Sequence, residues 1–294
     1  MEKRLAKLIG WPYAERKVAF HLPDFIDIIF NAGDSRNAIG ATVGQSLPNW
    51  GRVANESRGR TVAMSNLYTD ADSLRVRRAQ ATSLLEKDAV AGLADDPANA
   101  LLGTILHEAT HNLGPSHEYK FQGKTDSLAF GGGLASMMEE LKAQSGALYL
   151  LELLKNEKVI TPEVQRQSYL DSVTWSFGQI AQGMWTESGQ RKPYSQLAAI
   201  QLGFLMDQGA ITWDENAAAA NGKDKGAFRI AFEKLPAACE KLMKLVATIK
   251  ARNDKAGAEA LAKKYADGGK VPQSAIAERV LRFQKNSFVY ALDF

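Results

Sequence analysis

Cysteine, histidine and long apolar runs are all scarce in this chain of 294 residues. The single cysteine, Cys239, excludes an intrachain disulfide. No apolar run reaches the roughly 20 residues that a membrane-spanning helix requires, so we expect no membrane span. An excess of one charge is also lacking, because 36 basic and 33 acidic residues leave a net charge of only +3. Nucleic acid is therefore not an expected partner, since proteins that bind it carry a basic footprint.

The composition is otherwise that of an ordinary globular protein, with 45% hydrophobic and 23% charged residues. These values exclude a disordered chain, a collagen and a small disulfide scaffold. The length allows one large domain or two modest ones. We expect a single domain over residues 1–294, with a boundary between two lobes, if there is one, near 216–226. Nothing in the sequence selects an oligomeric state.

The opening residues carry no signal peptide, because Lys3, Arg4 and Lys7 interrupt the stretch where an apolar segment would stand. A cytoplasmic, reducing setting is therefore favoured. A longer precursor trimmed before Met1 would hide an export signal.

Hydrophobic patterning predicts a mainly α protein with a small N-terminal β-sheet, an α+β class. The apolar, β-branched runs at 25–30 and 60–68 are typical of strands, and the stretch between them is rich in loop-forming residues. Helical spacing dominates after a short amphipathic helix within residues 1–20. The expected helices lie at 73–94, 97–111, 134–155, 162–185, 193–208, 226–251, 255–266 and 273–285.

Three of the four histidines fall within eleven residues, in the segment His107-Glu108-Ala109-Thr110-His111-Asn112-Leu113-Gly114-Pro115-Ser116-His117. Two histidines four apart on a helix project from the same face. Their ring nitrogens can then meet one zinc ion at about 2.0–2.1 Å. Glu108 lies beside this face, where it can take a proton from a metal-bound water. The helix is apolar upstream, so its polar end needs a partner. One zinc ion per chain is the expected cofactor.

Two residues compete to be the third ligand. His117 completes the spacing HExxHxxGxxH, which is the metzincin pattern. Glu140 lies on the next long helix, at the centre of a mostly apolar face, where a carboxylate needs a cation. Glu139 lies near the edge of that face, and we expect it to be more easily solvated. A buried Lys or Arg is the alternative partner for Glu140.

The segment HEATHNLGP, followed by Glu139-Glu140-Leu141-Lys142-Ala143, resembles the dipeptidyl peptidase III family of zinc metallopeptidases. It is most similar to bacterial relatives whose zinc motif is HExxH. The resemblance implies a zincin-like catalytic lobe with an active-site helix, and a peptide substrate. It also implies that Glu140 is the third zinc ligand and that Glu108 is the general base. His117 would then lie near the metal without binding it, or face the substrate. The resemblance is specific over 100–155 and weaker over 20–70 and 160–215.

This chain departs from the family in three places. The main family spaces its histidines one residue further apart. Its Glu-Glu motif ends in an acidic residue where this chain has Gln144. The family also uses a downstream histidine to help stabilise the transition state, whereas no histidine follows His117 here. Tyr68, Tyr119 and Tyr149 are alternative donors to an oxyanion. We therefore expect a zinc peptidase, and keep two alternatives: a metzincin-like endopeptidase that uses His117, and a non-catalytic zinc-containing domain that binds peptides.

Overall fold

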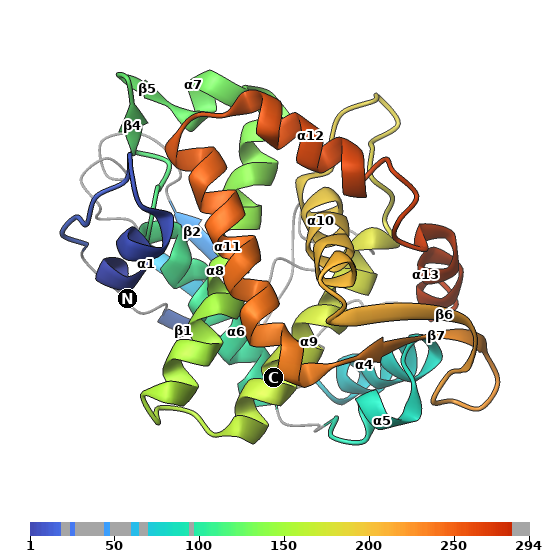
Figure 1. The fold of residues 1–294 in the computed structure, drawn as a ribbon. Helices are drawn as coiled ribbons and strands as arrows, with labels where there is room; N and C mark the ends of the chain where they lie inside the picture. The colour runs from blue at the N-terminus through green and yellow to red at the C-terminus, as the bar shows by residue number, and fades with distance from the viewer. Residues whose placement is uncertain (19–23, 27–43, 48–59, 65–69, 94–96, 284–294) are drawn as a thin grey trace, which may run out of the picture.

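The computed structural model describes residues 1–18, 24–26, 44–47, 60–64, 70–93 and 97–283. Within them the chain is mainly helical and carries three small sheets (Figure 1). The mainly α class expected from the sequence is thus confirmed. None of the helices in these ranges combines the length and the apolar composition that crossing a bilayer requires.

A short helix, α1 (Glu2–Ile9), precedes the N-terminal sheet, whose strand order is β1-β3-β2. The central strand β3 (Arg60–Met64) pairs in parallel with β1 (Asp24–Ile26) and antiparallel with β2 (Gly44–Leu47). The small N-terminal sheet is therefore confirmed, and β3 also contacts the helix that carries the histidines. Strand β2 corrects the expected loop at 31–59: its sequence GQSL has little strand propensity, and pairing with β3 holds it extended. The other residues of 25–68 that we predicted lie outside the described ranges.

The helix predicted at 73–94 is divided into α4 (Ala71–Leu84) and α5 (Lys87–Val90). The chain leaves the helix at Leu85, which is extended and bridges to Phe228 of a distant strand. The next backbone N–H, that of Glu86, donates to the Phe228 carbonyl over 3.0 Å. Pairing with this strand therefore replaces the helical hydrogen bonds that the local sequence favours.

The longest helix in the described part of the chain, α8 (Gly132–Asn156), lies at the centre of the helical body. It packs against α6 (Pro97–Asn112), α10 (Pro193–Asp207) and α11 (Leu235–Ala251), as Figure 1 shows. Around this group lie α7 (Asp126–Phe130), α9 (Pro162–Ile180), α12 (Lys255–Tyr265), α13 (Gln273–Val280) and the small hairpin of β4 (Lys120–Phe121) and β5 (Lys124–Thr125). The side chains of α8 enter both hydrophobic cores of the described chain: Leu150 and Leu151 join one, and Met137 and Leu141 join the other.

The helix predicted at 226–251 is wrong in its first part. Its first residues belong to β7 (Lys225–Ile230), which pairs antiparallel with β6 (Ile211–Ala218), and α11 begins only at Leu235. Phe228 of β7 is fully buried and stacks on Phe177 of α9, with ring centroids 5.1 Å apart. This contact holds residues 225–230 in an extended conformation, where the hydrophobic spacing of the sequence had predicted a helix from residue 226. The turn of the hairpin lies within 216–226, where we expected a loop or boundary.

Candidate metal centre

Helices α6 and α8 approach each other closely at Gly146. A Cβ atom added there would lie 2.1 Å from Thr110 Cγ2, so only glycine permits this approach. Thr110 lies on α6 directly before His111, and nearly two helical turns of α8 separate Gly146 from Glu140. The contact therefore sets the distance between the two faces that carry the site.

Three donor atoms from these faces converge. The Nε2 atoms of His107 and His111 are 3.2 Å apart, and Glu140 Oε2 lies 3.1 Å from the first and 3.7 Å from the second. Two imidazoles and one carboxylate form a donor set of catalytic zinc sites. Ligands 2.0–2.1 Å from a tetrahedral zinc ion lie about 3.3 Å from one another. The three atoms therefore fit around one such ion.

The other nitrogen of each histidine has a partner that fixes the orientation of the ring. His107 Nδ1 lies 3.0 Å from Gln144 Oε1, while Gln144 Nε2 donates to Ser172 Oγ over 3.0 Å. His111 Nδ1 lies 2.7 Å from Glu139 Oε1. Both partner atoms are acceptors, so each Nδ1 carries a proton, and the two Nε2 atoms face each other and Glu140. A metal-binding histidine generally has such an acceptor behind it.

The sequence departure at Gln144 thus has a structural explanation. The family motif ends in an acid at this position, and here the amide oxygen of Gln144 accepts the His107 proton instead. Compared with the acidic residue of the family motif, Gln144 still provides an acceptor for His107 but carries no negative charge. This role could not be read from the sequence, because the residue type alone does not show which group it faces.

The electrostatics of the cluster favour a charged Glu140. Burial by itself would raise the pKa of this carboxyl group, but the hydrogen bond from His107 and the charges of both histidines outweigh burial and lower it. Burial likewise opposes a charged His107, yet Glu140 and the more distant Glu108 raise the pKa of the ring above its ordinary value. The ring and the carboxyl groups therefore favour each other's charged forms.

Glu139 is not the solvated residue that we expected. It is enclosed by Lys142 at 3.1 Å, Lys250 at 2.7 Å and the His111 ring. Burial would raise the pKa of Glu139, but the two lysines and His111 hold it well below the usual range. The expectation for Glu139 was wrong because it considered only the face of its own helix, α8. Lys250, which pairs with Glu139, comes from α11.

Lys142 also closes the end of the histidine helix. Its ammonium group donates to the carbonyl oxygens of Thr110 at 2.7 Å, His111 at 3.0 Å and Leu113 at 3.3 Å. Carbonyls in the last turn of a helix have no partner within the helix, and a cation there is favourable. Gly114 follows with φ of 65°, a left-handed conformation that favours glycine, and ends the helix.

Glu108 is half-buried and belongs to the same group: it and both histidines offer ligand atoms within 4.8 Å of one another. His117 lies elsewhere. It is exposed, beyond the end of α6, and it is not part of this group. Of the residues named from the sequence, the structure therefore brings together His107, His111, Glu108, Glu139 and Glu140.

Sequence reasoning missed Tyr194, in the first turn of α10. This residue is 45% exposed, and its hydroxyl group lies close enough to Glu140 to contribute to the lowered pKa of that carboxyl group. Burial and the neighbouring carboxylates raise the pKa of Tyr194, so the hydroxyl group keeps its proton. Trp175 supports the ring edge-on, with centroids 6.4 Å apart. Lys192-Pro193 predicted the start of a helix, but no sequence signal placed that start beside Glu140.

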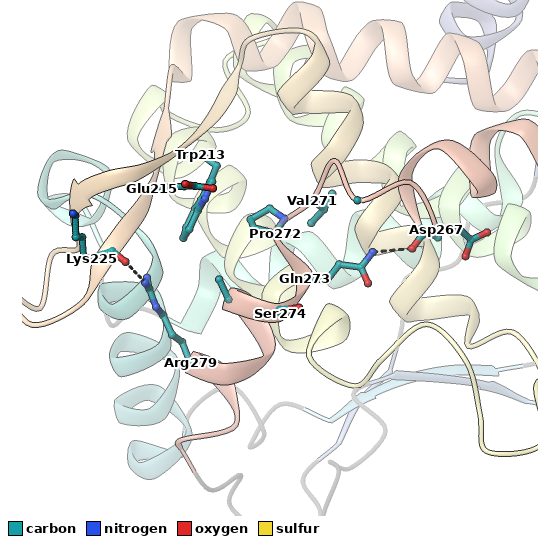
Figure 2. Close-up of a pocket in the computed structure, with 12 residues that line it drawn as sticks. Trp213, Glu215, Lys225, Asp267, Val271, Pro272, Gln273, Ser274 and Arg279 are labelled. Atoms are coloured by element: carbon teal, nitrogen blue, oxygen red, sulfur yellow. Dashed lines mark hydrogen bonds between the residues drawn. The ribbon is translucent and has the colours of Figure 1, made fainter.

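A separate cleft of about 650 Å³ lies between the β6–β7 hairpin, the segment before α13 and α13 itself (Figure 2). Trp213, Glu215 and Lys225 line one side, and Pro272 and Gln273 line the other. None of the residues around this cleft belongs to the histidine cluster, so it is not the candidate metal centre.

Comparison with known proteins extends these observations. No family model matches the chain. Its fold is similar to that of DPP III from Caldithrix abyssi (TM-score 0.74, 23% identity, 88% of this chain and 46% of that chain). It is also similar to dipeptidyl-peptidase III from Corallococcus sp. strain EGB (TM-score 0.70, 24% identity, 90% of this chain and 45% of that chain). These likenesses establish a DPP III-like fold for the described chain.

One curated relative, "Nudix hydrolase 3" of Arabidopsis thaliana, is 26% identical over 241 residues. The match covers 82% of this chain but 29% of that protein. This chain thus spans less than half the length of each of these relatives and neighbours.

Proposed function

We propose that this protein is a zinc-dependent peptidase, with one zinc ion held by His107, His111 and Glu140. The observation that carries the proposal is the convergence of the three donor atoms at 3.1, 3.2 and 3.7 Å from one another. Behind them, Gln144 and Glu139 accept from the Nδ1 atoms and orient both rings with Nε2 toward the proposed metal position.

When bound, zinc would supply Lewis-acid polarisation of the scissile carbonyl and a lowered pKa for water. Glu108, directly after His107 on α6, takes the proton of the attacking water and passes it to the leaving amine. Tyr194 has its hydroxyl group beside Glu140, from where it can donate a hydrogen bond to the oxygen that becomes negative. In the dipeptidyl peptidase III family a downstream histidine helps to stabilise the transition state, and this chain has no histidine after His117.

The fold supports a peptide substrate, because both similar structures are dipeptidyl peptidases by name. The resemblance of the two zinc motifs to the same family supports it independently. The name of the plant relative points to another hydrolase, but more than two thirds of that protein lies outside the match. We therefore base the proposed reaction on the histidine cluster.

Three variants test the assignment. Elemental analysis of the purified protein should find one zinc per chain, and Glu140→Ala should lose the metal. Glu108→Gln should keep the metal and lower kcat by at least about 100-fold, the size of a lost general base. His117→Ala is the matched histidine control and should keep both.

Cleavage is measured on a panel of short peptides with and without a chelator, and the products are identified by mass spectrometry. Metal loss in His117→Ala but not in Glu140→Ala would favour the metzincin-like site. Tight peptide binding without chelator-sensitive cleavage would favour a non-catalytic zinc domain.

A further inference from the structure

A buried group of four charges lies behind His111, and the proposed reaction does not use it directly. Its members are Asp126 of α7, Glu139 and Lys142 of α8, and Lys250 of α11. Both lysine side chains are at most 1% exposed. Buried lysines are rare, because an ammonium group loses its hydration in the interior.

Lys250 joins the two carboxylates. Its Nζ atom contacts Asp126 Oδ2 and lies 2.7 Å from Glu139 Oε2. The other oxygen of Glu139, Oε1, accepts from His111 Nδ1 over 2.7 Å. A continuous path of charged contacts thus runs from α7 through α11 to the histidine ring.

The charges within this group balance, with two carboxylates against two ammonium groups. Lys142 is also committed to the three carbonyls at the end of α6. Within the described residues, Lys250 has no such second role, because both side chains that it contacts are carboxylates. It is therefore the cation that holds Glu139 Oε2, and so decides how Glu139 presents Oε1 to His111.

We infer that Lys250 is a positioning residue for the metal centre: through Glu139 it fixes the His111 ring with its proton on Nδ1 and its Nε2 lone pair toward His107 and Glu140. The metal-binding part of this inference rests on the proposed function. The ring orientation does not, because it follows from contacts among the chain's own residues. Asp126, from α7, is the second carboxylate that contacts the Lys250 ammonium group.

The charge of Lys250 is tested with Lys250→Met, which keeps the length of the side chain. Lys244→Met is the matched control, because Lys244 is exposed on the same helix. Since Lys250→Met leaves two buried carboxylates with one ammonium group, it could lose its fold. The double variant Asp126→Asn/Lys250→Met removes one charge of each sign and keeps the group balanced. Lys250→Arg restores the cation.

The first readout needs no metal. Nitrogen NMR of the His111 side chain in metal-free protein should show the proton on Nδ1 in the wild type and in Lys244→Met. In Lys250→Met, and in the balanced double variant, we expect a mixture of the two tautomers. Lys250→Arg should restore the wild-type spectrum at least in part.

The second readout is metal affinity, measured by competition with a chelator, together with the visible spectrum of the cobalt-substituted protein. We expect about 10-fold weaker binding and an altered cobalt spectrum in both variants that lack Lys250, near the lower end of effects seen for groups behind metal ligands. In a Glu139→Gln background, Lys250→Met should cause no further loss.

An unchanged His111 tautomer in the folded double variant would overturn the inference, whatever the metal affinity. An additional loss from Lys250→Met in the Glu139→Gln background would overturn it too, since Lys250 would then act by another route. If wild-type protein shows the Nδ1 tautomer but binds no zinc, the proposed function fails and the positioning role stands.

Discussion

Two regions of the molecule each bury a cation, and they use it differently. Lys250, 1% exposed, faces two carboxylates beside the histidine cluster. Arg279, 5% exposed, lies behind the β6–β7 hairpin and donates only to backbone carbonyls: those of Ser83, Gly226 and Lys225, at 2.5–2.6 Å. Lys250 contacts Glu139, which in turn contacts the His111 ring, whereas Arg279 binds backbone carbonyl groups.

Lys250 therefore affects the candidate metal centre, whereas Arg279 stabilises the fold. Arg279 links α4, β7 and α13, and without it three carbonyls would lose their donor. Among the described residues, Lys250 contacts carboxylates and no backbone carbonyl, so its loss changes the charge around side chains. Burial of a charged residue is therefore weak evidence of function until its partners are known.

The largest expected effect on stability comes from Arg279→Met. Leaving buried carbonyls without a donor costs about 1 kcal/mol or more each, so we expect a loss of about 3 kcal/mol in the free energy of unfolding. Zinc affinity should not change in protein that remains folded. Chemical denaturation and chelator competition measure the two quantities. The control Arg282→Met, which removes exposed ion pairs to Asp224 and Glu278, should cost less than about 1 kcal/mol.

Gly146→Ala should affect both fold and site. The added methyl group forces α6 away from α8 at Thr110, which costs about 1–3 kcal/mol, as overpacking does elsewhere. Because the ligands lie on both helices, zinc affinity should fall as well. The control is Gly178→Ala in α9, where a Cβ atom meets nothing within 4 Å. There, alanine should be neutral or stabilising. An unchanged zinc affinity in Gly146→Ala would show that this contact does not set the site.

Gln144→Leu should act on the site and leave the fold nearly intact. The variant removes the acceptor of the His107 Nδ1 proton, and the loss of such a partner lowers metal affinity about 10- to 100-fold. Gln144→Glu keeps an acceptor and should retain the metal. Equal affinities in wild type and Gln144→Leu would contradict the role given to the amide oxygen.

The smallest effect concerns a partly exposed carboxylate far from either buried cation. Asp207 of α10 accepts from Tyr265 and pairs with Lys264 and Lys270 at 2.7 and 2.9 Å. Hydrogen bonds from these two lysines lower the pKa of Asp207 well below its ordinary value. Its contribution, at most about 1 kcal/mol for an exposed network, is thus fully present above the unfolded pKa of about 4. It is lost as the pH falls through the lower, folded pKa.

Asp207→Asn should accordingly destabilise the protein at pH 7 and make no difference at the acid end. Unfolding curves of both proteins over a range of pH test this. A stability difference that persists unchanged down to pH 2 would contradict the ion-pair origin.

Local patterns predicted the helical class and the HExxH helix over 97–111, because each depends on residues within a few turns. They failed where distant strands intervene. Leu85 leaves its helix to pair with Phe228, and residues 225–230 become a strand because Phe228 stacks on Phe177. Such competition between propensity and tertiary pairing cannot be seen in a window of sequence.

The site divides in the same way. The spacing of His107 and His111 and the apolar setting of Glu140 are local properties, and both indicated a cluster that the structure brings together. Lys250 and Tyr194 join it from helices far along the chain, at distances in sequence that no spacing rule reaches. Whether the brought-together residues bind zinc remains the prediction tested above.

The contacts that link Lys250 of α11 to His111 through Glu139 also have a consequence for the order in which the site forms during synthesis. His111 and Glu139 are synthesised more than 100 residues before Lys250, and α11 lies near the end of the described chain. A nascent chain that stops before residue 250 would hold Glu139 without one of its two cations. The histidine ring therefore reaches its final setting only when Lys250 has been made and α11 has packed against α8.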